Sequence, residues 1–124
     1  MATRHYSVEE ANAALGWVSE RIEKLRSARV RLTDEEVREA LSEAAPTNGG
    51  GEPGRTVSEA FLDMRSALAD LQAQEIVLRD LDRGLVDFPA MRDGREVYLC
   101  WIEGEDEIGY WHDLDAGYGG RQPL

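Results

Sequence analysis

The chain has 124 residues and a mass of 13.9 kDa, a length that fits one domain and is too short for two separate cores. Its 14 basic and 25 acidic side chains give a formal net charge of -11, so a nucleic-acid backbone or an anionic membrane surface would repel it. With 42% hydrophobic residues the chain can build a core, yet no apolar run approaches the ~20 residues that cross a bilayer. These features exclude nucleic-acid and membrane partners.

The N-terminus and the cysteine content indicate where the protein resides. The first residues (Met-Ala-Thr-Arg-His-Tyr-Ser) lead into an acidic helix start and lack the apolar centre of a secretion signal. The single cysteine, Cys100, excludes an internal disulfide and is typical of a reducing compartment. We therefore expect a cytoplasmic protein.

A first long helix is predicted from a capping box at its start. Ser7 is followed three residues later by Glu10, so each side chain can satisfy the other's free backbone N–H. Apolar residues then recur at steps of three and four, with only Arg29 out of place. These residues are Val8, Ala11, Leu15, Val18, Ile22, Leu25 and Leu32. We predict one helix over about 8–45, in which Thr33 marks the place for a kink, and then a flexible Gly/Pro loop over 46–55.

A second helix is predicted over about 57–83, with Gly84 as its C-terminal cap. Its apolar seam is interrupted by Glu75 and comprises Val57, Phe61, Met64, Leu68, Leu71 and Leu78. The two helices should form an antiparallel hairpin whose register brings Arg29 within one turn of Glu75, so that the two charges pair. The same register leaves residues 8–19 overhanging and free to pack on the segment that follows.

That segment has the pattern of β-strands. Asp93-Gly94 is the commonest two-residue hairpin turn and joins the apolar runs 85–91 and 96–102. In this register Phe88 faces Leu99 on an apolar face, and Asp87 faces Cys100 on the opposite one. Pro89 predicts that the first strand lies at the sheet edge.

A third strand over 108–112 completes the predicted fold, and the Gly-rich tail 113–124 is expected to be irregular. The fold class is therefore α+β: a long antiparallel helical hairpin followed by a small three-stranded antiparallel β-meander over 85–112. We expect residues 1–124 to form a single domain.

Several motifs in the second half of the chain resemble a known family. Residues 78–89 (Leu-Arg-Asp-Leu-Asp-Arg-Gly-Leu-Val-Asp-Phe-Pro) resemble a signature of the prokaryotic domain-of-unknown-function family 2203. The segments Val-Tyr-Leu-Cys-Trp at 97–101 and Ile-Gly-Tyr-Trp-His at 108–112 resemble the same family, and Glu-Ala-Asn at 10–12 adds support. The resemblance implies a small prokaryotic cytosolic protein, and it carries over no catalytic residues.

The predicted sheet could bring together a Cys, a His and an Asp. If Trp111 joins Leu99 on the apolar face, His112 lies on the other face beside Cys100 and Asp87. Such a set could act as a nucleophile with its base and orienting carboxylate, or bind a divalent metal. The simpler interpretation is a half-exposed face on which Tyr and His cover a small buried Cys. A register shift of one residue would dissolve the cluster.

The pentapeptide Asp-Leu-Asp-x-Gly occurs twice, at 80–84 and 113–117. A calcium loop of the EF-hand type would need a third oxygen ligand and a Glu at its twelfth position, and both copies lack that Glu. The simpler interpretation is that these aspartates face solvent or cap turns. A looser site for Mg²⁺, Mn²⁺ or Zn²⁺ from His112, Asp113 and Asp115 stays open.

The helical seam and the lack of a complete catalytic motif favour a non-catalytic protein-interaction or self-associating module. Its expected partner is a second copy or another protein, and no cofactor is predicted. The alternative is a metal- or small-ligand-binding protein, which could be a metal-dependent enzyme. Its site would lie on the C-terminal sheet face and use His112, Asp113, Asp115, Asp87 and Cys100. Whether the protein is an enzyme stays open at this stage.

Overall fold

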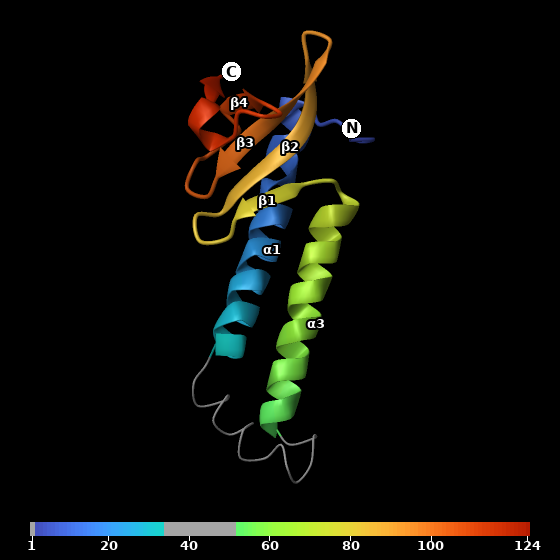
Figure 1. Ribbon diagram of the computed structural model, residues 1–124, viewed down its shortest axis with the longest axis vertical. Helices are drawn as coiled ribbons and strands as arrows, with labels where there is room; N and C mark the ends of the chain where they lie inside the picture. The colour runs from blue at the N-terminus through green and yellow to red at the C-terminus, as the bar shows by residue number, and fades with distance from the viewer. Residues whose placement is uncertain (1, 34–51) are drawn as a thin grey trace.

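The computed structural model describes residues 2–33 and 52–124, which form two antiparallel helices and an antiparallel sheet (Figure 1). The helices are α1 (Val8–Thr33) and α3 (Glu52–Ala73). They are followed by β1 (Val77–Asp80), β2 (Leu85–Arg92), β3 (Arg95–Ile102), β4 (Tyr110–Asp113), the 3-10 helix η1 (Tyr118–Gly120) and β5 (Gln122–Pro123). The α+β class is confirmed, but the sheet has five strands and not three.

Helix α1 begins as the sequence predicts. Glu10 N donates to Ser7 Oγ at 3.0 Å, and Ser7 N donates to Glu10 Oε1 at 2.9 Å, which completes the capping box. The buried stripe of the helix follows the predicted seam and consists of Ala11, Val18, Ile22, Leu25 and Ala28. The predicted continuation to residue 45 lies outside the described residues. No helix within the described ranges is long and apolar enough to cross a membrane.

Helix α3 starts and ends earlier than predicted. It begins at Glu52, inside the expected 46–55 loop, and ends at Ala73, ten residues before the expected end at residue 83. A Schellman motif ends it: Ile76 N donates to Leu71 O and Glu75 N to Gln72 O, both at 3.0 Å. Glu75 adopts the left-handed conformation that usually favours glycine, with φ 58. The predicted C-terminal cap at Gly84 is therefore wrong, and Leu78 lies in a strand.

The two helices also pair in a register that differs from the predicted one. Lys24 Nζ lies 3.4 Å from Ser66 Oγ, and Arg31 pairs with Asp63 at 2.6 Å. The predicted pairing of Arg29 with Glu75 is wrong, because Glu75 has left the helix; Arg29 pairs with Asp82 instead, at 2.7 Å.

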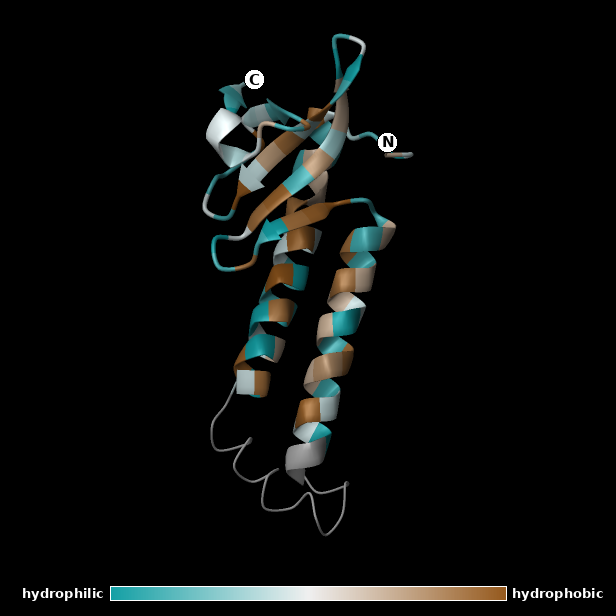
Figure 2. Cartoon of the chain, viewed as in Figure 1, coloured by the Kyte–Doolittle hydropathy of each residue, from teal (hydrophilic) through white to brown (hydrophobic). Residues whose placement is uncertain are grey.

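Apolar bands recur along both helices in Figure 2, but only some of the apolar side chains of α3 are buried. Ala60, Ala67 and Leu71 are buried. In contrast, Phe61 and Leu68 of the predicted seam are 58% and 45% exposed. The predicted seam of α3 is therefore only partly the buried one.

The central hairpin has the predicted register. Phe88 pairs with Leu99, and Asp87 pairs with Cys100. The turn residues Asp93 and Gly94 have φ 52 and 80, as a type I′ turn requires.

Strands β1 and β4, which flank this hairpin, differ from expectation. Strand β4 starts at Tyr110 instead of residue 108, and it pairs Trp111 with Leu99. Residues 77–80, expected to be helical, pair as β1 with β2, so β2 is not an edge strand. The pairing of β1 with β2 stops at Asp87, so the missing N–H of Pro89 interrupts no hydrogen bond between these strands. The carbonyl oxygen of Pro89 accepts a hydrogen bond from Tyr6 N at 2.7 Å.

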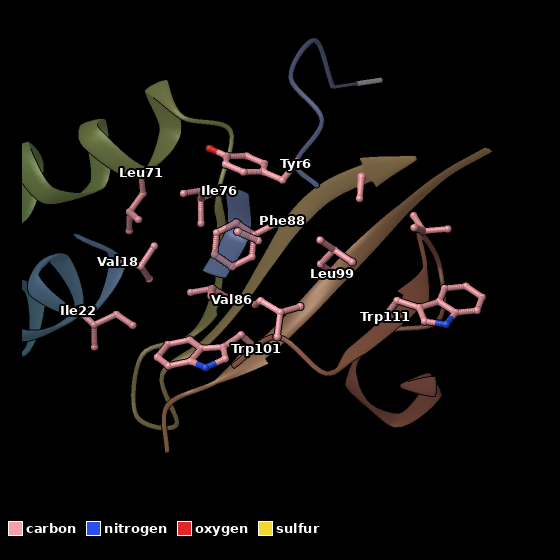
Figure 3. Packing of buried hydrophobic residues seen from close by; sticks show 14 of the residues in the cluster. Tyr6, Val18, Ile22, Leu71, Ile76, Val86, Phe88, Leu99, Trp101 and Trp111 are labelled. Carbon is pink, nitrogen blue, oxygen red and sulfur yellow. The ribbon is translucent and has the colours of Figure 1, made fainter. Parts of the chain in front are cut away.

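The core fills the space between the N-terminal part of α1 and one face of the sheet (Figure 3). Ala11 and Val18 of the predicted overhang belong to the same buried cluster as Phe88 and Trp111. The Tyr6 ring packs edge-on against Phe88, with 5.3 Å between ring centroids. The overhang therefore packs on the sheet as predicted, and the other sheet face is left for the side chains that alternate with this core.

The C-terminal tail is more ordered than the sequence predicts. After β4 the chain forms η1, and then β5 pairs with β4 through Trp111 and Gln122. Arg121 pairs with Glu105 at 2.7 Å and stacks 4.0 Å from the Tyr110 ring centroid. The tail thereby returns to the sheet and lies over its outer face, which we define as the face that carries Asp87, Cys100 and His112.

Candidate metal centre

Three potential metal ligands from three neighbouring strands meet on the outer face. Asp87 comes from β2, Cys100 from β3 and His112 from β4, and their ligand atoms all lie within 4.8 Å of one another. Their exposed fractions are 2%, 1% and 1%, respectively. The strand register brings them together. Asp87 pairs with Cys100 of β3, and His112 pairs with Tyr98, which lies two residues before Cys100 on the same strand β3. The sequence allows this cluster on the condition that Trp111 joins Leu99 on the apolar face, and the β3–β4 register meets that condition.

The imidazole of His112 has a partner on each side. Its Nδ1 lies 2.7 Å from the carbonyl oxygen of Asp113, and its Nε2 lies 3.0 Å from Asp87 Oδ1. A carbonyl oxygen only accepts hydrogen bonds, so Nδ1 carries the proton. Nε2 then faces a carboxylate oxygen, and either a second proton or a cation must lie between them. A backbone carbonyl that orients the far ring nitrogen is the usual support of a metal-binding histidine.

Asp87 is held from the other side by Arg79. Arg79 Nε donates to Asp87 Oδ2 at 2.9 Å, and the guanidinium carbon lies 5.1 Å from the Tyr98 ring centroid. The two carboxylate oxygens of Asp87 thus have separate roles, since Oδ2 binds Arg79 and Oδ1 faces His112. The positive charge of Arg79 compensates a carboxylate that is otherwise buried.

Cys100 is a thiol when no cation is bound. Desolvation by burial, followed by the negative charge of Asp87, raises the pKa of Cys100 from 9.0 to about 12. A neutral thiol is a poor nucleophile, because the thiolate is the reactive form. The nucleophile interpretation of the cluster therefore loses support, whereas a bound metal would favour the thiolate directly.

A cavity of about 280 Å³ borders all three cluster residues. Its other lining residues are Arg79, Leu85, Leu114, Asp115, Gly117 and Tyr118. The segment after β4 supplies four of these six, so the ordered tail forms the outer wall. A fourth ligand could reach the cluster through this cavity.

The other two predicted site residues lie apart from the cluster. The carboxylate of Asp113 pairs with Arg95 at 2.9 Å, and only its backbone oxygen contacts His112. Asp115 is exposed and lines the cavity without joining the group of possible ligands. Sequence reasoning missed Arg79 and Tyr118, because residue 79 was assigned to a helix and residue 118 to an irregular tail. The β-branched pair Ile76-Val77 just before Leu78 and Arg79 is a strand-like signal that could have revealed the place of Arg79.

The fold and this cluster define a small α+β protein with a buried Asp–Cys–His group that opens to a cavity. The family model described as "Uncharacterized conserved protein (DUF2203)" matches residues 4–124, and the chain belongs to this family. No curated protein and no solved structure matches the chain.

Proposed function

We propose that the protein binds a divalent transition metal, Zn²⁺ in the first place, through Asp87 Oδ1, Cys100 Sγ and His112 Nε2. The observation that carries the proposal is the approach of His112 Nε2 to Asp87 Oδ1 while a carbonyl holds the opposite ring nitrogen. Two buried ligand atoms thus face each other in a position that a cation would satisfy.

The kind of donor supports zinc. Nitrogen, sulfur and carboxylate oxygen are the ligands that Zn²⁺ takes, whereas Ca²⁺ and Mg²⁺ prefer oxygen alone. In a tetrahedral zinc site, the nitrogen and oxygen ligand atoms lie about 3.3 Å apart. The 3.0 Å between His112 Nε2 and Asp87 Oδ1 requires only a small expansion.

The number of donors supports an open site. Structural zinc sites have four protein ligands, whereas sites that bind or convert a small molecule have three and keep the fourth position open. The cluster offers three, and the cavity borders each of them. The metal is therefore proposed to serve ligand binding and not only stability.

The proposal is tested by adding Zn²⁺ to chelator-treated protein and measuring heat by calorimetry and bound metal by elemental analysis. We expect one Zn²⁺ per chain, and we expect His112→Ala and Cys100→Ser to lose it while keeping the helical circular dichroism. His5→Ala is the matched control, because His5 Nε2 also faces a carboxylate, Glu96, at 3.3 Å but lies outside the cluster. Wild-type protein that takes up no Zn²⁺ would overturn the proposal.

A second candidate function is self-association through the outer side of α3. Phe61, Leu62 and Leu68 are exposed there and, with Met64 and Arg65, line a shallow apolar hollow. Glu59 and Arg65 lie three residues on either side of Leu62. An antiparallel pairing of α3 with its copy, centred on Leu62, would therefore place Arg65 of each copy beside Glu59 of the other. The proposed occupant of this face is a second copy of the chain.

Sedimentation equilibrium tests this pairing. Leu62→Glu should convert a dimer into a monomer, because it places two like charges at the centre of the pair. Ser27→Glu, at an exposed position of α1, should leave the mass unchanged. A wild-type protein that stays monomeric at high micromolar concentration would contradict the self-association.

A further inference from the structure

The cavity beside the cluster has the size of a small organic molecule. Its volume of about 280 Å³ corresponds to roughly nine water volumes. Leu85, Leu114 and Tyr118 supply apolar surface, and Arg79 and Asp115 supply opposite charges. A molecule that fits must therefore be short, partly apolar and matched to the charges around the metal position.

The charges next to the metal position favour an anion. A divalent metal is neutralised by the carboxylate of Asp87 and the thiolate that Cys100 would form on the metal. The guanidinium of Arg79, which is 42% exposed, then adds a positive charge beside the metal position, and the exposed Asp115 adds a negative charge elsewhere on the cavity wall. An anion on the metal would also be attracted by the guanidinium of Arg79, so a molecule with a single negative charge fits this side of the cavity.

Arg79 is held in a position to bind that anion. Its Nε is the atom that pairs with Asp87, and the Tyr98 ring supports the guanidinium. The guanidinium also has a side-chain hydrogen bond with Tyr98, and its remaining N–H groups are left for another acceptor. A guanidinium has five N–H donors, so Arg79 can hold Asp87 through Nε and donate to one oxygen of a bound carboxylate through another nitrogen.

We infer that the cavity binds a small monocarboxylate, with one carboxylate oxygen on the metal and the other on Arg79. Its short apolar tail would lie against Leu85 and Leu114. The exposed carboxylate of Asp115 at the cavity wall disfavours a second negative charge, so the site should select a monocarboxylate over a dicarboxylate. This inference rests on the metal site proposed above.

The test uses full-length protein loaded with Co²⁺, whose visible absorption reports the ligands of the metal. Butyrate and succinate are the probes. We expect butyrate to change the Co²⁺ spectrum in a saturable way, and succinate to do so only at concentrations several-fold higher. Arg79→Met should weaken the response to butyrate roughly tenfold while the Co²⁺ stoichiometry stays at one, because a charge-assisted hydrogen bond is lost.

Two further variants separate specific effects from general ones. Arg83→Met is the matched control, because Arg83 stacks on the Tyr118 ring at 4.3 Å but does not line the cavity; it should respond to butyrate as the wild type does. Asp115→Asn should bring the response to succinate close to that to butyrate.

The outcomes distinguish this inference from the proposed metal site. A Co²⁺ spectrum that neither acid changes would overturn the carboxylate site and leave the metal site standing. If the chain shows no Co²⁺ absorption at all, both proposals are wrong. An Arg79→Met variant with wild-type butyrate affinity, or equal responses of the wild type to the two acids, would likewise overturn the inference.

Discussion

His112 Nε2 and Asp87 Oδ1 lie 3.0 Å apart, and both side chains are almost fully buried, with exposed fractions of 1% and 2%. Both side chains are therefore largely shielded from bulk water. The pair therefore couples the chemistry of the outer sheet face to the stability of the fold, because any change to one residue leaves a buried polar group without its partner.

Removal of Asp87 should destabilise the metal-free protein strongly. Asp87→Ala leaves the buried His112 without its acceptor and Arg79 without its ion-pair partner, and a buried polar group left without its partner costs about 1–3 kcal/mol. Urea unfolding followed by circular dichroism measures the change. Asp82→Ala is the control, because Asp82 forms an exposed ion pair with Arg29 and should cost at most about 1 kcal/mol. Equal losses in the two variants would contradict a special role of the buried pair.

Glu75 should hold the N-terminal segment in a pH-dependent way. Its carboxylate accepts hydrogen bonds from Thr3 N, Thr3 Oγ1 and Arg4 N. These bonds, that from Thr3 N first, hold the pKa of Glu75 below its ordinary value of 4.5. A lowered carboxyl pKa means that the docking stabilises above pH 4.5 and is lost as pH falls through the folded pKa.

Amide hydrogen exchange of Thr3 and Arg4 measures this docking. Protection at neutral pH should vanish in acid in the wild type. Glu75→Gly suits the φ of 58 at this position but lacks the carboxylate, so its residues 3 and 4 should be unprotected at every pH. Persistent protection in Glu75→Gly would show that other contacts hold the segment.

Cys100 should react slowly and lower the stability of the metal-free protein in alkali. Burial raises its pKa from 9.0 to about 12, so a thiol-specific reagent should label native protein far more slowly than unfolded protein at pH 8. Because the unfolded thiol ionises first, the free energy of unfolding should fall as pH rises from about 9 towards about 12. Cys100→Ala should show a flatter alkaline decline. Rapid labelling of the native, chelator-treated protein would contradict the burial of the thiol.

Replacing Gly84 or Gly16 by alanine should change the stability in opposite directions. Gly84 has φ +64, and an added Cβ would lie 2.6 Å from Glu103 Cβ, so Gly84→Ala should cost about 2–4 kcal/mol. Gly16 lies inside α1 with nothing within 4 Å of an added Cβ, and Gly16→Ala should stabilise by about 0.5–1 kcal/mol. Thermal unfolding of the two variants checks both signs. A neutral Gly84→Ala would mean that the turn before β2 can move away from Glu103.

Several parts of the structure were predictable because their causes are local. Ser7 and Glu10 define the start of α1 by reciprocal capping, three residues apart. Asp93 and Gly94 adopt the turn that sets the β2–β3 register, which places Asp87 opposite Cys100.

The end of α3 was not predictable from the pattern of apolar residues. Leu71 and Leu78 are seven residues apart and fit a helical seam, yet the chain turns at Glu75. The carboxylate of Glu75 is engaged by Thr3, which is 72 positions away in the chain, and Ile76 is buried in the core beside Leu71. Contacts so distant leave no signal in a local window, so the sequence also failed to predict β1 and the place of Arg79.

The sequence by itself determined the helix start, the hairpin and its two faces, because each depends on residues within a few positions of one another. Only the tertiary structure decided whether His112 joins Asp87 and Cys100. The register of β4 depends on distant packing: Trp111 lies on Leu99, and Ile108 N donates to Asn12 Oδ1 of α1 at 2.7 Å. A slip of one residue would turn His112 into the core, and the burial of Trp111 together with the hydrogen bond from Ile108 to Asn12 opposes it.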